Sequence, residues 1–204
     1  EPFMLKLTQE LFNNADPELN RARAELTPEE MLKSLWETTM ELENYFAAVT
    51  KKFRENPTTH INSLIANAKI DGEYLNHRQM MGYYIIAATA GHDTTSNTTA
   101  GAMWAMAERP GMLKQMQANP ELINAFVEES IRWEVPVKHF MRSAVSDTEI
   151  GGRQIKAGDW LMLSYQSANR DESVWADPFE YRIDRKDNPQ IAFGYGVHVC
   201  LGQH

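Results

Sequence analysis

The chain has 204 residues, of which 43% are hydrophobic and 24% charged, a composition typical of a globular domain and not of a disordered or fibrous protein. Its formal net charge of −8 argues against nucleic acid as a partner and leaves a small apolar molecule open. With one cysteine there is no intramolecular disulfide, which agrees with a cytoplasmic location. We expect neither a signal peptide nor a membrane span, because the most apolar stretch, 80–106, is interrupted by polar residues.

Helical patterns dominate the first two thirds of the chain. Helices are predicted over residues 3–14, 28–55, 60–68, 76–108, 112–118 and 120–133. Thr27, followed by a proline and three positions later by Glu30, predicts a capping box at the start of the helix 28–55. The side chains expected to face inward from this helix are Leu32, Leu35, Trp36, Met40, Leu42, Phe46 and Val49.

The pattern changes after Pro136. Short strands separated by glycine turns are predicted at 141–145, 148–150, 153–156 and 160–163. An irregular stretch, 169–190, then leads to a glycine-spaced loop, 193–200. The predicted fold class is mainly α with a small β region. We expect one partial domain, with a helical part at 1–135 and the strands, irregular segment and loop at 136–204.

The segment 193–202 reads Phe-Gly-Tyr-Gly-Val-His-Val-Cys-Leu-Gly. Its glycines allow the backbone to approach a flat ligand closely. If Leu201 and Gly202 begin a helix, the position of Cys200 favours the thiolate, which is the form that binds iron. Two other interpretations remain open at this point. Cys200 is either a buried structural cysteine or part of a His-x-Cys metal site, although two further ligands are missing nearby.

A weak point lies within the predicted helix 76–108, at Ala90-Gly-His-Asp-Thr-Thr. Gly91 costs about 1 kcal/mol in a helix interior relative to alanine, and the Thr94 hydroxyl can bend the helix by bonding to the carbonyl of Ala90. Asp93 and Thr94 place an acid beside an alcohol, and such a pair can relay protons. Taken alone, the segment is better explained as a helix packed through small residues, with Asp93 in a surface ion pair.

Two arginines are candidates for carboxylate partners. Glu129 and Arg132 stand three positions apart on one predicted helix face, and such a pair is usually solvent-exposed and worth less than about 1 kcal/mol. Arg142 follows the turn after Pro136 and is suited to binding a carboxylate with two hydrogen bonds. The alternative for Arg142 is a surface arginine at the end of a strand.

Together these segments resemble the cytochrome P450 family over essentially the whole chain. F-G-x-G-x-H-x-C-L-G matches the haem-binding loop of that family, A-G-x-D-T-T its oxygen-activation segment, and E-x-x-R its buried acid–arginine motif. The stretches 82–95 and 136–171 look most like the bacterial members that hydroxylate α-terpineol. The fold implied is a partial cytochrome P450 fold, with the oxygen-activation helix at about 76–108.

The resemblance implies a role for each matching residue. Cys200 would be the iron ligand of haem b (iron protoporphyrin IX), Thr94 would hydrogen-bond dioxygen, and Asp93 would help to deliver protons. The other implied haem contacts are Ala90, Gly91, Arg142, Phe193, Gly194, His198 and Gly202, with Phe193 shielding the sulfur and Arg142 and His198 meeting propionates.

Further roles are structural or concern the substrate. Glu129 and Arg132 would form an ion-pair group with Arg185. The chain departs from the family here, with Tyr181-Arg182 where Phe-Asp is frequent, and this puts the pairing of Arg185 in doubt. The substrate pocket would be bordered by Ile86, Thr89, Val137 and Phe140.

The implied function is a haem-dependent monooxygenase that hydroxylates a small hydrophobic substrate, a terpenoid, with dioxygen and with electrons from a ferredoxin. The alternatives are a peroxide-driven haem-thiolate enzyme and a non-catalytic haem-binding sensor or carrier. We interpret the chain as a fragment that lacks the N-terminal portion and the C-terminal helix and strands of such a protein, and we expect it to hold haem poorly by itself.

Overall fold

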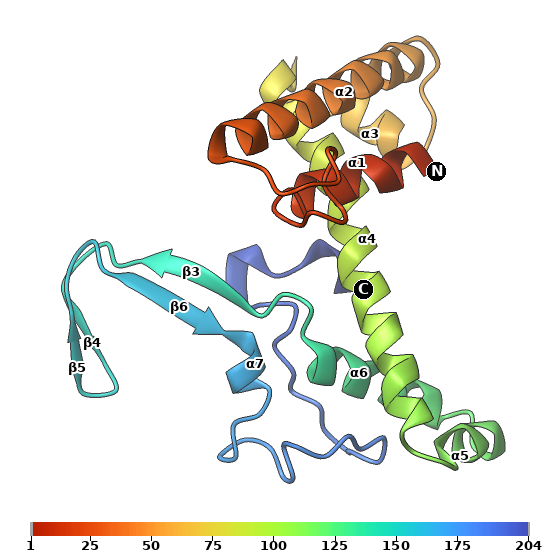
Figure 1. The fold of residues 1–204 in the computed structure, drawn as a ribbon, viewed down its shortest axis with the longest axis vertical. Coiled ribbons are helices and arrows are strands. Elements are labelled where there is room, and N and C mark those ends of the chain that lie inside the picture. Colours follow the sequence, from red (N-terminus) through yellow and green to blue (C-terminus); the bar gives the residue numbers. More distant parts are fainter. Residues whose placement is uncertain (1, 204) are drawn as a thin grey trace. The chain divides into compact units, whose positions relative to one another are not determined.

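The computed structural model describes residues 2–203 and divides into two compact units, one ending at Asp93 and one beginning at Thr94 (Figure 1). Each unit has its own hydrophobic cluster. The division falls inside the longest helix, α4 (His77–Ala107). The two units are therefore described separately.

The first unit is helical apart from one small hairpin. It contains α1 (Pro2–Phe12), α2 (Pro28–Glu55), α3 (Ile61–Asn67), β1 (Lys69–Ile70), β2 (Glu73–Tyr74) and the first half of α4. The predicted capping box is present, because the Thr27 hydroxyl accepts from the Glu30 amide and the Glu30 carboxylate accepts from the Thr27 amide at 2.9 Å. Asp71 and Gly72 both have positive φ, which suits a two-residue hairpin turn.

An aromatic pair lies at the centre of the first unit. Phe46 of α2 and Tyr84 of α4 stack with ring centroids 4.6 Å apart, and both are buried. The Tyr84 hydroxyl donates to the carbonyl of Asn62 in α3 and lies 3.2 Å from the hydroxyl of Thr50 in α2. One buried tyrosine thus connects three helices, and its polar end is fully used.

The buried face of α2 differs from the one predicted. Leu32 and Trp36, expected to face inward, are 69% and 64% exposed, so that part of the prediction is wrong. Side chains two positions apart on a helix point in nearly opposite directions, about 200° apart. Leu32 and Trp36 each stand two positions from a buried residue of α2, so they lie on the opposite, exposed face. Every fourth residue makes up that row, which consists of Ser34, Thr38, Leu42, Phe46 and Thr50. Three of these are polar, so hydrophobicity alone could not locate the face.

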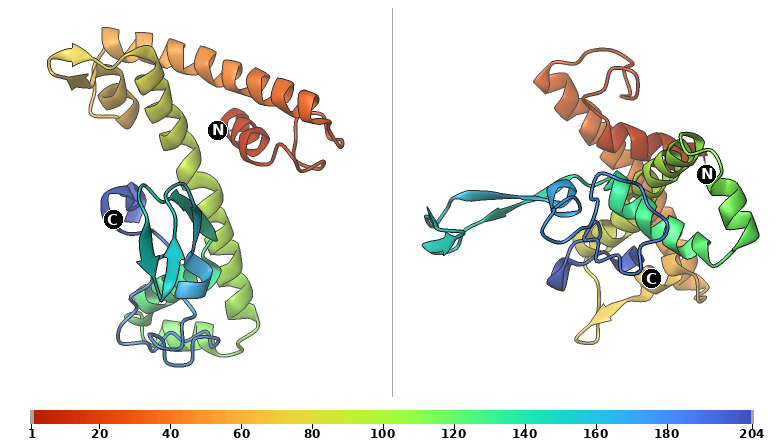
Figure 2. Two further views of the ribbon diagram at one scale, coloured as in Figure 1. Left: turned by 90° about the vertical axis from the view of Figure 1, so that its left-hand side faces the viewer. Right: turned by 90° about the horizontal axis from the view of Figure 1, so that it is seen from below.

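The second unit joins helices to a narrow β region (Figure 2). Its helices are the rest of α4, α5 (Met112–Ala118), α6 (Leu122–Glu134), α7 (Tyr165–Ala168), η1 (Gly196–His198) and η2 (Leu201–Gln203). Its strands are β3 (His139–Ser143), β4 (Thr148–Ile150), β5 (Arg153–Ile155) and β6 (Trp160–Ser164). The hairpin β4–β5 is nested within the antiparallel pair β3–β6. The first strand begins two residues earlier than predicted, and α7 was not predicted.

The core of the second unit brings the irregular segment against the helices. Its buried cluster consists of Ala105, Met112, Met116, Tyr181 and Ile183, from α4, α5 and the segment after α7. The predicted fold class, mainly α with a small β region, is confirmed. Among residues 2–203, no helix combines the length and hydrophobicity that a membrane span needs.

Candidate functional site

The cysteine loop, residues 193–200, is shaped by its own backbone. The Gly194 amide donates to the Ile191 carbonyl at 2.8 Å, and the Cys200 amide donates to the Phe193 carbonyl at 2.9 Å. Gly194 and Gly196 have φ values of 76° and 78°, a region that only glycine enters at little cost. The glycine spacing therefore permits a tight double turn that ends at the cysteine.

Cys200 presents its thiol at the surface of the second unit. The side chain is exposed, and the Gly202 amide points at the sulfur with an N to Sγ distance of 3.4 Å. This backbone N–H donates a hydrogen bond to the sulfur. Tyr195, Val197 and Leu201 are each more than 90% exposed beside it. An accessible sulfur with a backbone donor and apolar neighbours fits a flat apolar group that carries a metal.

This exposure bears on the two other interpretations of the cysteine. A buried structural role does not agree with an exposed thiol. The His-x-Cys metal site finds no support either, because no group of three or more His, Cys, Asp or Glu side chains within residues 2–203 is arranged to hold a metal ion.

The oxygen-activation segment, residues 90–95, lies wholly within α4 and remains helical throughout. A methyl group added at Gly91 would meet no atom within 4 Å outside its own helix, so the described side chains do not fill the space beside it. The Asp93 carboxylate lies 2.8 Å from Nδ1 of His92, a contact that the sequence did not predict. Asp93 and Thr94 are both half-buried. An acid, an imidazole and an alcohol therefore stand at three consecutive positions.

The four residues predicted to border a substrate pocket belong to different units. Ile86 is 56% exposed, whereas Thr89 is 2% exposed and its hydroxyl donates to the Ile85 carbonyl; both lie in the first unit. Val137 is half-buried and Phe140 is 51% exposed, and both lie in the second unit. A pocket formed by all four remains a prediction.

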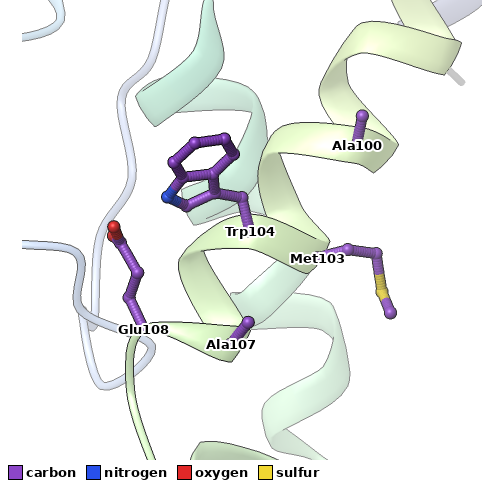
Figure 3. A pocket seen from close by; sticks show the side chains of 5 residues that line it. All are labelled: Ala100, Met103, Trp104, Ala107 and Glu108. Atoms are coloured by element: carbon purple, nitrogen blue, oxygen red, sulfur yellow. The ribbon is translucent and has the colours of Figure 1, made fainter.

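A shallow hollow is present on a different part of α4. It has a volume of about 580 Å³, and Figure 3 shows its lining side chains on successive turns of the helix. None of the predicted pocket residues contributes to it. The lining residues are Ala100, Met103, Trp104, Ala107 and Glu108.

Glu129 is the most fully enclosed acid of the second unit. Its carboxylate receives two hydrogen bonds of 2.7 Å from Arg132, and both side chains are 0% exposed. The same carboxylate accepts from Arg185 at 3.1 and 3.2 Å. The structure thus brings the three predicted residues together, and the pair Glu129–Arg132 is not the solvent-exposed pair that its spacing alone suggested.

The two arginines direct their remaining donors to the irregular segment. Arg132 donates to the carbonyls of Asn169, Pro178 and Glu180 at 2.8 to 3.0 Å. Arg185 donates to carbonyls of the same stretch, those of residues 176, 177 and 180. A segment without regular secondary structure is therefore held by charged side chains.

The departure at Tyr181-Arg182 has a structural explanation. The Tyr181 hydroxyl lies 2.5 Å from the Ser130 hydroxyl, so α6 supplies a partner for the extra oxygen. Burial raises the pKa of Tyr181 to about 12, while the hydrogen bond with Ser130 opposes the shift. The Arg182 amide donates to Glu129, and its side chain pairs with Asp177 and Asp184 at the surface. Arg185 is therefore left to occupy the site beside Glu129.

The candidate propionate partners are exposed. Arg142 lies in β3, where its guanidinium donates to the Met141 carbonyl, and it forms no ion pair within the described part of the chain. His198 ends η1 and is also exposed. Both side chains are accessible to an external carboxylate. Phe193, which was expected to shield the sulfur, is half-buried.

Two residues behind the loop were missed. Asn169 is 0% exposed, and its side-chain oxygen accepts from the Ile191 amide at 2.9 Å. Tyr165 is buried, and its hydroxyl lies 3.2 Å from the point that a Cβ on Gly194 would occupy. Both come from α7 or the residue after it. The sequence held no signal for them, because a polar residue in an irregular stretch is usually exposed.

The chain is similar to known proteins over its whole length. The cytochrome P450 family model matches residues 2–121 and 112–204. The chain is 43% identical to cytochrome P450-terp of a Pseudomonas species, over 100% of this chain and 48% of that protein. It is 34% identical to linalool 8-monooxygenase of Pseudomonas putida, over 92% of this chain and 44% of that protein.

A solved structure shows the same fold. The crystal structure of CYP108D1 from Novosphingobium aromaticivorans aligns with a TM-score of 0.85 at 42% identity, over 98% of this chain and 45% of that one. The chain therefore belongs to the cytochrome P450 family. It spans about half the length of the curated relatives it matches.

Replacing the buried acid should be costly. In Glu129→Gln, two guanidinium groups lose their shared counter-charge, and we expect the free energy of unfolding in urea to fall by about 3–5 kcal/mol. Glu128→Gln is the matched control, because Glu128 is the exposed neighbour on the same helix, and its effect should stay within about 0.5 kcal/mol. Equal effects of the two variants would contradict the role given to Glu129.

The buried tyrosine predicts a loss of stability at high pH. The pKa of Tyr181 is raised by folding, so its contribution is complete below the ordinary value of 10 and is lost as the pH rises toward about 12. Subtracting the phenolate absorbance titration of Tyr181→Phe from that of the parent should leave one phenol with a midpoint near pH 12. A difference titration centred at pH 10 would show that Tyr181 is not buried as described.

Proposed function

We propose that this chain carries the haem-binding and oxygen-activating residues of a monooxygenase, with Cys200 as the protein ligand of the iron of haem b. The observation that carries the proposal is the exposed thiol at the end of a glycine-shaped loop, with the Gly202 amide 3.4 Å from its sulfur. Membership of the cytochrome P450 family supports it.

The residues around the sulfur fit a haem group. Gly194 and Gly202 allow the backbone to lie close to a flat ring, and half-buried Phe193 would cover the sulfur. Arg142 and His198 would hold the propionates with charge-assisted hydrogen bonds. Ala90 and Gly91 of α4 are small residues that the family resemblance gives as further haem contacts, and no described side chain fills the space beside Gly91.

Protons would reach the reacting centre through α4. Bound haem supplies the electron transfer that activates dioxygen, and a cysteine thiolate increases the electron density on its iron. The Thr94 hydroxyl would donate a proton at the reacting centre, and the Asp93 carboxyl group, in its protonated form, would then return a proton to the Thr94 oxygen. Asp93 is itself in contact with the partly exposed ring of His92, which gives it an exchangeable proton from the solvent side.

The substrate would be a small hydrophobic molecule, a terpenoid, bordered by Ile86, Thr89, Val137 and Phe140. Support comes from the 34% identity to linalool 8-monooxygenase and from the 43% identity to cytochrome P450-terp. Electrons would come from a ferredoxin, and the protein would act in the cytoplasm. A peroxide-driven enzyme or a haem sensor would have less use for the acid–alcohol pair Asp93–Thr94.

Because this chain is expected to hold haem poorly by itself, the cysteine ligand is tested by Cys200→Ser in a longer haem-loaded protein that includes residues 1–204. We expect the strongly red-shifted ferrous carbon monoxide band of a thiolate-ligated haem in the parent and its complete loss in the variant, because the serine hydroxyl does not supply a thiolate. A band of the thiolate type in Cys200→Ser would overturn the assignment.

The oxygen-activating role is tested by Thr94→Val. The change should leave the consumption of electrons in place and lower the yield of hydroxylated product by about 10-fold to 100-fold, because the hydroxyl that holds the proton is removed. Thr99→Val is the matched control, since Thr99 lies on the same helix, is exposed, and donates only to the helix backbone. An unchanged ratio of product to electrons in Thr94→Val would contradict the role given to Thr94, whereas a parent protein that forms no product would favour the sensor or carrier.

A further inference from the structure

Asn169 carries a fully buried side-chain amide between the ion-pair group (Glu129, Arg132 and Arg185) and the cysteine loop. Its side-chain oxygen accepts from the Ile191 amide at 2.9 Å, and its side-chain nitrogen donates to the Arg132 carbonyl at 3.4 Å. Its own carbonyl accepts from the Arg132 guanidinium at 2.8 Å. Together these contacts join α6 to the residues that lead into the cysteine loop.

The hydrogen bonds continue from Ile191 into the loop itself. The Ile191 carbonyl accepts from the Gly194 amide at 2.8 Å. The Phe193 carbonyl, in between, accepts from the Cys200 amide at 2.9 Å. A fixed position of Ile191 therefore constrains the turn at Gly194 and, through Phe193, the backbone of the cysteine.

The short helix α7 gives a second contact with the same loop. Tyr165, its first residue, is buried and places its hydroxyl against Gly194, while Asn169 follows its last residue. The Asn169 amide donates to the Tyr165 carbonyl at 2.9 Å, so the two side chains are held at a fixed spacing. Ile191 and Gly194, at the start of the cysteine loop, are thus both in contact with side chains of the α7 turn.

The chemistry of the side chain favours a positioning role over mere filling of space. An apolar residue of similar volume would occupy the same site but could not accept from the Ile191 amide. The loop has no means of its own to hold this position if the bond from the Ile191 amide is lost. Its glycines have unusual backbone freedom and no side chains that could pack. The amide oxygen of Asn169 is therefore the group that fixes the position of the Ile191 backbone, just before the loop.

We propose that Asn169 is a positioning residue that sets the cysteine loop so that Cys200 stays a thiolate ligand. The proposal rests on the proposed haem ligation by Cys200. Asn169 does not touch the reacting atoms; it acts through Ile191 and Phe193. The family resemblance implied no role for Asn169.

The test compares variants of Asn169 in the haem-loaded protein. In Asn169→Leu the acceptor is lost, and we expect the ratio of non-thiolate to thiolate ferrous carbon monoxide forms to rise about tenfold, as the loss of one buried hydrogen bond implies. Asn169→Asp keeps an acceptor oxygen for the Ile191 amide but loses the donor to the Arg132 carbonyl, so it should restore part of the thiolate form. Ser130→Ala is the control, because Ser130 is equally buried on α6 but bonds to Tyr181 and not to the loop.

Hydrogen exchange of the Ile191 and Gly194 amides gives a readout that does not depend on the haem spectrum. Exchange at both should be about tenfold faster in Asn169→Leu, or in Asn169→Ser if the leucine variant does not fold, and unchanged in Ser130→Ala. Unchanged exchange together with an unchanged spectrum would overturn the proposal, as would equal spectral losses in Ser130→Ala. A parent protein without a thiolate band would instead overturn the ligand role of Cys200, and the exchange rates would then decide on Asn169 alone.

Discussion

The second unit depends on the carboxylate of Glu129. Removing an acid and an arginine from water costs several kcal/mol for each ion, and the cost is offset only when charge and hydrogen bonds are both satisfied. Here Arg132 and Arg185 supply the charge, and the carbonyls of the irregular segment take up the remaining donors. Between α7 and η1 this segment forms no helix or strand, so it lacks the backbone hydrogen bonds of regular secondary structure. The hydrogen bonds from the two arginines hold it instead.

The cysteine loop depends on that core because its own sequence leaves it loosely determined. Glycines at 194 and 196 permit the positive φ values of the turn, but the same freedom makes the turn costly to order. The side chains at 195 and 197 are almost fully exposed and add little packing. What fixes the loop must therefore come from behind it, and the structure offers Asn169 and Tyr165 of the α7 turn.

Local patterns in the sequence predicted the elements well, and tertiary contacts account for what they missed. The helix 28–55 was predicted to the residue, because its capping box and the following proline are local signals. Leu32 and Trp36 were misplaced because the buried face of α2 carries Thr38, which bonds to Glu10 of α1. The three ion-pair residues were found by family resemblance, whereas the complete burial of Glu129 and Arg132 could not be predicted, since it depends on where the irregular segment folds back.

The two parts of the proposed site, the pair Asp93–Thr94 and the ligand Cys200, differ in how far local sequence determines their positions. Asp93 and Thr94 are consecutive residues of one continuous helix, so their side chains are set about 100° apart by helix geometry alone. In the proposed mechanism this angle would let the alcohol face the reacting centre while the acid contacts His92, and a short motif is enough to specify it. The proposed iron ligand has no such local frame, because the groups that hold its loop come from α6 and the α7 turn, which lie far from Cys200 in the sequence. The cysteine motif is therefore enough to propose the ligand, whereas the side chains that keep it in place become visible only once the chain has folded.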